Sequence, residues 1–169
     1  MISNLYSSNY WIEKLGLTQH PEGGYYREIY SSIDYVDGAL LSGQYHGKRN
    51  LSTSIYFLLS SSDISHFHRL RSDEIWYFHY GSPVLIHTLD TKGKYHITVL
   101  GCNIDKEEVP QVIIPAGTIF GAEVKNDNSY SLVGCMVSPG FSFDDFELMD
   151  RKLLIGKYPE YKELIIKFT

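Results

Sequence analysis

The chain has 169 residues, of which 43% are hydrophobic and 21% charged. This composition is typical of a globular protein with one sizeable core. The net charge of −5, without a run of Lys and Arg, excludes the basic surface of a nucleic-acid-binding protein. Cys102 and Cys135 lack CxxC spacing and predict free thiols. With no signal-peptide pattern and no apolar run of about 20 residues, we expect one cytoplasmic domain over residues 1–169 and no membrane partner.

The N-terminal part predicts a helix, a strand and a loop-rich stretch. Residues 8–17 predict a short amphipathic helix, because Trp11, Ile12 and Leu15 have helical spacing and Gly16 marks the end. "YYREIY", residues 25–30, follows a Pro-Gly-Gly turn and predicts a strand. Residues 34–50 carry several turn signals and predict a loop with weak strand character.

From Leu51 onward the pattern is almost entirely that of β structure. Short β-branched or aromatic runs, separated by Ser, Asp, Gly, Pro and Asn turns, predict strands at 52–59, 64–70, 74–81, 83–90, 94–101, 111–117, 118–124 and 130–140. Many short strands at regular spacing indicate an antiparallel sandwich or barrel. Residues 150–158 and 159–168 then predict two helices, with Pro159 in a first turn. The expected fold is therefore mainly β, with short helices at both ends.

Residues 65–83 hold the polar groups best placed for chemistry. In an extended strand His66 and His68 would point to the same face. Glu74 opens the next strand, and antiparallel neighbours bring opposed side chains to roughly 5 Å. The two imidazoles and the carboxylate are thus expected to converge, with Trp76 and Phe78 on the face of Glu74. His79 is expected on the opposite face.

The same stretch resembles the first cupin motif. The spacing of His66, His68, Glu74 and Gly81 follows that motif, with one extra residue before the glutamate. "PAGTIF" resembles the second motif, but Phe120 stands where the motif has its histidine. The resemblance implies a three-ligand metal site at His66, His68 and Glu74, suited to iron(II), manganese or zinc. It does not firmly imply a cofactor, because the fourth ligand is missing.

A closer resemblance covers nearly the whole chain. Five blocks are similar to the cupin-5 family of cupin-like proteins: "HPEGGYYRE", "SIYFLL", "SHFHRLRSDEIWYFH", "PAGTIFGA" and "SLVGCMVSPGFSFDDFEL". This resemblance implies a double-stranded β-helix, the jelly-roll barrel of cupins, similar in fold to dTDP-4-dehydrorhamnose 3,5-epimerase. It also implies a homodimer. It brings no firm reaction with it.

Without metal, the same cluster predicts acid–base chemistry. A carboxylate among aromatic rings is desolvated and its pKa rises, and a neighbouring histidine exchanges protons near neutral pH. We therefore take His66 and Glu74 as candidate catalytic residues, with Tyr56 or Tyr77 as a partner acid. Such a set suits proton abstraction beside a carbonyl, as in sugar epimerases and isomerases.

The remaining candidates are ligand-binding residues. Glu22 and Arg27 lie in the "HPEGGYYRE" block, whose glycines allow close backbone approach, and Arg71 lies at the expected barrel rim, where a guanidinium grips anionic groups. The other members of the predicted pocket are His68, Trp76, Phe78 and Phe120. The sequence predicts a protein that binds a small polar, sugar-like ligand in the barrel. A metal-dependent oxygenase-type cupin and a non-catalytic binding module are the alternatives.

Overall fold

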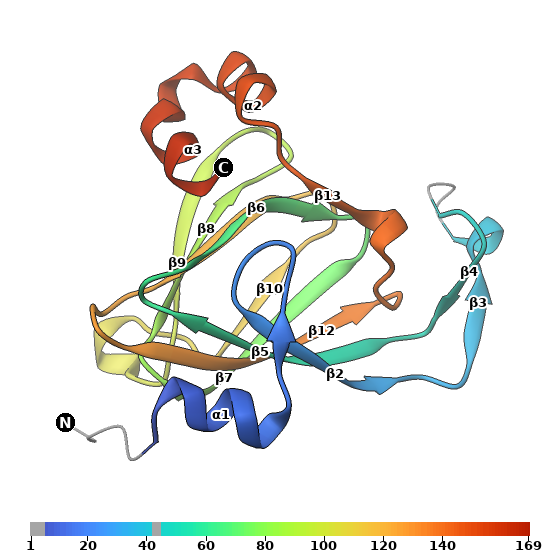
Figure 1. Cartoon of the computed structure of the whole chain (residues 1–169). Coiled ribbons are helices and arrows are strands. Elements are labelled where there is room, and N and C mark those ends of the chain that lie inside the picture. Colours follow the sequence, from blue (N-terminus) through green and yellow to red (C-terminus); the bar gives the residue numbers. More distant parts are fainter. Residues whose placement is uncertain (1–5, 42–44) are drawn as a thin grey trace.

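The computed structural model describes residues 6–41 and 45–169, which form two facing antiparallel sheets and a projecting two-stranded ribbon (Figure 1). The six-stranded sheet has the order β1 (Thr18–Gln19), β2 (Tyr25–Ser31), β5 (Thr53–Ser60), β12 (Tyr130–Ser138), β7 (Asp73–Gly81), β10 (Gln111–Ile114). The five-stranded sheet has the order β13 (Phe146–Leu148), β6 (Ile64–Leu70), β11 (Ile119–Val124), β8 (Val84–Leu89), β9 (Tyr95–Leu100). The ribbon pairs β3 (Tyr35–Asp37) with β4 (Lys48–Asn50).

The core lies between the two sheets. Its largest fully buried side chains include Phe57, Trp76, Ile86 and Phe120, contributed by alternating inward positions of strands from both sheets. This arrangement confirms the predicted mainly β cupin barrel with helices at its ends. Every run predicted as a strand from residue 52 to residue 140 contains one.

Helices cover the outer face of each sheet. Helix α1 (Ser8–Leu15) is capped by Ser7 and ends at Gly16, whose φ of 62° is left-handed. Its Trp11, Ile12 and Leu15 pack on Leu58 and Leu132 of the six-stranded sheet. Helices α2 (Arg151–Lys157) and α3 (Lys162–Phe168) cover the five-stranded sheet, burying Phe168 against Phe67. Short 3-10 turns complete the chain at Gly38–Leu40, Ile104–Lys106, Phe143–Asp145 and Pro159–Tyr161.

The described part of the chain contains no helix long and apolar enough to cross a membrane. The segment that follows β12 is not extended. Phe143 belongs to a 3-10 turn that starts with Ser142 as its cap, because the Ser142 side chain accepts a hydrogen bond from the Asp144 backbone N–H. Residues 141–146, which we call the aromatic strap, therefore turn across one end of the barrel and do not continue β12.

Candidate functional site

A cavity of about 300 Å³ lies inside the barrel beneath the aromatic strap. Its polar lining residues are His20, Glu22, Glu28, Thr53, His68, Glu74 and Cys135. Its apolar lining residues are Tyr26, Ile55, Phe57, Leu70, Val137, Phe141, Phe143 and Phe146. An apolar cavity with a few converging polar groups is the usual form of a small-ligand site, and its volume suits a small molecule.

A β-bulge in β6 decides which side chains of that strand reach the cavity. Phe120 of β11 pairs with His68, but Ala122, two residues further along β11, pairs with Ser65, three residues back along β6. The extra residue reverses the alternation of side chains. Ser65 and His68 therefore face inward together, whereas His66 lies in a separate depression beside Met149 and Thr169.

The inward pair binds the carboxyl group of Glu22, which is buried at 6% exposure. Ser65 Oγ donates to Glu22 Oε1 at 2.9 Å. Glu22 Oε2 lies 3.3 Å from His68 Nε2 and 3.4 Å from His20 Nδ1. The loop before β2 and the bulged strand β6 thus assemble one carboxyl and two imidazoles at the cavity wall.

The backbone contacts of the two histidines fix their tautomers. His68 Nδ1 lies 2.7 Å from the His66 carbonyl, which only accepts, so Nδ1 carries the proton. His20 Nδ1 accepts the Glu22 backbone N–H at 3.3 Å, so it carries a lone pair. When both rings are neutral, Glu22 Oε2 faces two lone pairs, and a proton on the carboxyl group satisfies the contact.

The pKa values follow the same arrangement. Burial raises the pKa of Glu22 to about 8, opposed by the Ser65 hydrogen bond. Burial, together with the charge of the other histidine, lowers the pKa of His20 to about 4. Burial likewise lowers the pKa of His68 to about 4, against the hydrogen bond to His66. Near neutral pH the cluster therefore holds a protonated carboxyl group and two neutral imidazoles.

His66 holds the Glu22 loop from outside the cavity. The Glu22 carbonyl accepts both the His66 backbone N–H and the His66 Nδ1–H, each at 2.7 Å. The loop lies so close to β6 that a Cβ on Gly23 would be 2.0 Å from the Ile64 carbonyl oxygen. Gly23 also has a φ of 109°, which favours glycine. The glycine pair thus permits the approach that His66 secures.

Glu74 faces the cavity from β7 and is also buried, at 7% exposure. Burial and the neighbouring Glu22 raise the pKa of Glu74 to about 8, while the Trp76 indole and the Cys135 thiol oppose the rise. In turn, burial and both carboxyl groups raise the pKa of Cys135 well above its usual value, so that thiol is not a nucleophile at neutral pH.

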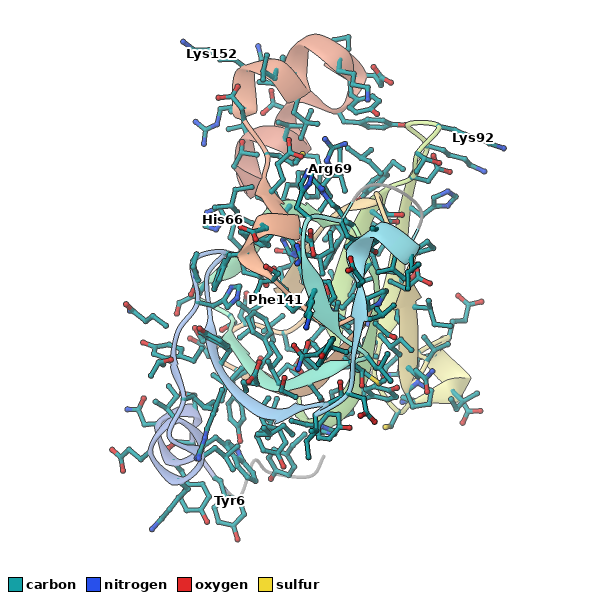
Figure 2. All side chains as sticks on the ribbon, turned by 90° about the vertical axis from the view of Figure 1, so that its right-hand side faces the viewer. Tyr6, His66, Arg69, Lys92, Phe141 and Lys152 are labelled. Carbon is teal, nitrogen blue, oxygen red and sulfur yellow. The ribbon has the colours of Figure 1, made fainter. Side chains whose placement is uncertain are left out.

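The aromatic strap closes the cavity and is anchored by a buried ion pair. Arg49 of β4 makes a bidentate contact with Asp145, with Nε–Oδ2 at 2.6 Å and Nη2–Oδ1 at 3.0 Å. A second contact holds the start of the strap, where the Phe141 backbone N–H donates to Thr53 Oγ1 at 2.9 Å. Figure 2 shows Phe141 near the middle of the view, with Arg69 and His66 closer to the C-terminal helices.

Three of the predicted site residues line the cavity: Glu22, His68 and Glu74. The predicted convergence of His66 with His68 and Glu74 is wrong, because the bulge turns His66 away. Tyr56 and Arg27 also lie elsewhere. Tyr56 packs outside the six-stranded sheet near α1, and Arg27 donates to the Leu15 carbonyl there.

The other predicted ligand-binding residues lie in the core or at the rim. Trp76 and Phe120 are 1% exposed core residues, and Phe120 packs on His68 at 4.1 Å between ring centroids without lining the cavity. Phe78 packs against the same core and lines a different surface depression. Arg71 lines the neighbouring cavity of about 660 Å³, beside Asp145. His79 is exposed, as predicted.

Sequence reasoning missed His20, Ser65, Cys135 and the phenylalanines of the strap as lining or supporting residues. His20 belongs to the block "HPEGGYYRE", whose glycines already indicated a segment close to a ligand. The run "FSFDDF" contained the signal for the strap, since Phe141, Phe143 and Phe146 are unusually dense for an exposed turn. The strand β7 also has a bulge between Phe78 and Tyr80, which breaks the simple alternation of its side chains.

The residues present do not fit a cupin metal centre. Among the described residues no group of three or more His, Cys, Asp and Glu side chains is arranged to hold a metal ion. Of the three predicted ligands, His66 lies outside the cavity. Phe120, at the position of the motif histidine, is a buried ring that meets Trp76 edge to face. A metal would also have to displace the Ser65 and histidine contacts of Glu22.

The fold and the enclosed site define a cupin-type β-barrel with a polar cluster and a closing strap. Residues 9–149 match the family model Cupin_5, described as cupin superfamily (DUF985), and the chain belongs to this family. It is similar to a Shewanella oneidensis protein, with 42% identity, 98% of both chains covered and a TM-score of 0.88. It is also similar to a hypothetical protein from Leishmania major, with 36% identity, 97% and 99% coverage and a TM-score of 0.89.

A more distant likeness concerns the fold alone. Oxalate decarboxylase from Bacillus subtilis matches with 18% identity and a TM-score of 0.55, over 89% of this chain and 36% of the decarboxylase chain. No curated protein matches the sequence significantly.

Proposed function

We propose that the protein binds a small polar, sugar-like ligand in this cavity and transfers protons on it, as an epimerase or isomerase does. The observation that carries the proposal is the pair of buried carboxyl groups, Glu22 and Glu74, facing one cavity. Aromatic walls suit the apolar faces of a ring, and the carboxyl groups suit its hydroxyl and carbonyl oxygens.

The pair supplies one acid and one base. Each carboxyl has a raised pKa of about 8, and the charge of Glu22 raises that of Glu74. When one carboxyl ionises, the other therefore holds its proton more tightly. The ionised group can take a proton from a carbon beside a carbonyl, and the neutral group can donate a hydrogen bond to the oxygen that gains charge.

His68 and His20 orient this chemistry. Each presents a ring nitrogen to Glu22 Oε2 and remains neutral near neutral pH. Ser65 holds the other oxygen. His66 is a positioning residue in this scheme, because it binds only the backbone of Glu22. The metal-dependent alternative finds no support in the arrangement of these residues.

The test is exchange of carbon-bound hydrogen with solvent. Candidate ketoses and aldoses are incubated with the protein in D₂O, and NMR follows deuterium entering beside the carbonyl. We expect exchange that falls by about 100-fold or more in Glu22→Gln and Glu74→Gln. His79→Ala, on the outer side of β7, is the control and should keep full exchange. Exchange that survives both glutamine variants would contradict the proposal, and binding without exchange would support a non-catalytic module.

A further inference from the structure

Apart from two histidines, the ionisable side chains that line the cavity are acids, among them three carboxyl groups and one thiol. Its lining includes three carboxyl side chains, Glu22, Glu28 and Glu74, and among the described residues that line it there is no Lys or Arg. A carboxylate or phosphate ligand would meet no positive partner there, and it would lie against buried acidic groups. Anions are therefore poor ligands for this cavity.

Arginines beside the aromatic strap have acidic partners, and Arg71 Nε also lies 4.0 Å from Asp145 Oδ1. Arg49 is held by Asp145 in the bidentate pair beneath the strap. Arg69 donates to Glu147 at 2.7 Å in the neighbouring cavity. Turning either guanidinium toward a bound anion would break an existing pair, so these residues do not reverse the sign of the site.

Aromatic rings form the rest of the wall. Tyr26 and Phe57 approach from β2 and β5, and Phe143 and Phe146 approach from the strap. His20 contacts these rings, with 4.6 Å between its centroid and that of Tyr26. A ring face carries partial negative charge and attracts an organic cation that has lost its water. Carboxyl groups and ring faces that line the same small cavity provide both forces that hold such a cation.

We propose that the ligand of this cavity is a small organic cation, with a protonated or alkylated amine between Glu22 and Glu74 and its carbon skeleton against the aromatic rings. This inference rests on the proposed function in one respect, because it assigns the ligand to the same cavity. It narrows the ligand class to amine-bearing compounds, such as amino derivatives of sugar-like molecules, and it excludes sugar acids and sugar phosphates.

A bound cation would also change the ionisation of the carboxyl groups. Glu22 and Glu74, with pKa values of about 8, are mostly protonated at neutral pH. His20 and His68 are neutral at neutral pH because their pKa values are lowered, and the Cys135 thiol is neutral because its pKa is raised. Glu28 also lines the cavity. A bound cation favours ionisation of one carboxyl, which releases a proton and leaves a base beside the ligand.

The experiment compares three probes with the same branched skeleton: tetramethylammonium, tert-butyl alcohol and pivalate. Ligand-observed NMR titration near neutral pH gives their affinities, and titration calorimetry in two buffers of different ionisation enthalpy gives the protons released. We expect tetramethylammonium to bind about 30-fold or more tightly than the alcohol, with proton release, and pivalate not to bind.

Two variants decide whether the preference belongs to the cavity. Glu74→Gln keeps the shape of the side chain and should remove most of the preference for the cation. Glu13→Gln removes an exposed carboxyl of helix α1, outside the cavity, and should keep the preference. Equal binding of the alcohol, no binding of tetramethylammonium, or equal loss in both variants would overturn the inference. Hydrogen exchange into neutral sugars would still support the proposed function in each of those cases.

Discussion

At the scale of single residues, the site depends on Glu22, whose side chain and backbone carbonyl both have polar contacts. Glu22 contributes its side chain to Ser65, His68 and His20, and its carbonyl oxygen to His66. His66 and His68 therefore have different roles, although they are only two residues apart. His68 acts on the side chain of Glu22, and His66 acts on its backbone.

The buried carboxyl groups predict an unusual dependence of stability on pH. Glu74 has a folded-state pKa of about 8, raised from 4.5, so the folded state binds more protons than the unfolded state between those values. Its contribution to stability is full below about pH 4.5 and is lost as the pH rises through about 8. We expect a loss on the order of 4 kcal/mol between about pH 5 and pH 9.

Glu74→Gln removes that titration. The variant should therefore lose less stability than the wild type over the same pH range, and the difference should appear in urea-unfolding curves at the two ends of the range. A wild type and a variant with parallel pH profiles would show that Glu74 is not held protonated in the folded protein.

At the scale of elements, the cavity is closed by the aromatic strap and the loop before β2. Neither is a regular helix or strand, and each is fixed by contacts to a strand distant in sequence. The loop is bound to β6 through His66, and the strap is bound to β4 through Arg49 and Asp145. The precision of the site therefore depends on a few polar contacts at its edges.

The ion pair of the strap should be costly to break. Arg49 and Asp145 are each 5% exposed, so Asp145→Asn leaves a buried guanidinium without its charge partner. We expect a loss of about 3–5 kcal/mol in the free energy of unfolding and weaker ligand binding. Asp144→Asn is the matched control, because its side chain is 76% exposed and lies 3.9 Å from Arg49. It should change stability by about 0.5 kcal/mol or less. Similar losses in both variants would refute the anchoring role.

At the scale of the whole molecule, β2 leads into the projecting ribbon of β3 and β4 (Figure 1), and apolar side chains of this region are exposed. Ile33 is 96% exposed, Tyr30 54% and Tyr35 57%. Exposed apolar patches of this kind commonly mark protein interfaces. A homodimer that buries this region, including part of β2, remains a prediction.

The dimer is tested by light scattering at micromolar concentration. We expect a dimeric wild type and a monomeric Ile33→Asp, Tyr35→Asp double variant, because two buried charges oppose association. Leu153→Asp is the control, since Leu153 is 77% exposed on α2, away from the ribbon. A monomeric wild type would refute the prediction, and a dimeric double variant would place the interface elsewhere.

The sequence by itself determined most of the framework. The strand runs, the capped N-terminal helix and the C-terminal helices follow from local periodicity and turn residues, which act over a few neighbouring positions. The motif spacing placed His68 and Glu74 in the barrel, and the glycine-rich block placed Glu22 near it.

Only the tertiary structure decided which faces those residues present. The bulge that separates His66 from His68 depends on pairing with β11, which lies far along the chain, and one extra residue is enough to reverse a side chain. Phe120 entered the core because Trp76 of the facing sheet and His68 of the neighbouring strand β6 pack against its ring. The strap crossed the barrel because Arg49 binds Asp145 from a distant strand. Such contacts have no local signature in the sequence, since the energy that fixes them arises only when the two sheets have packed.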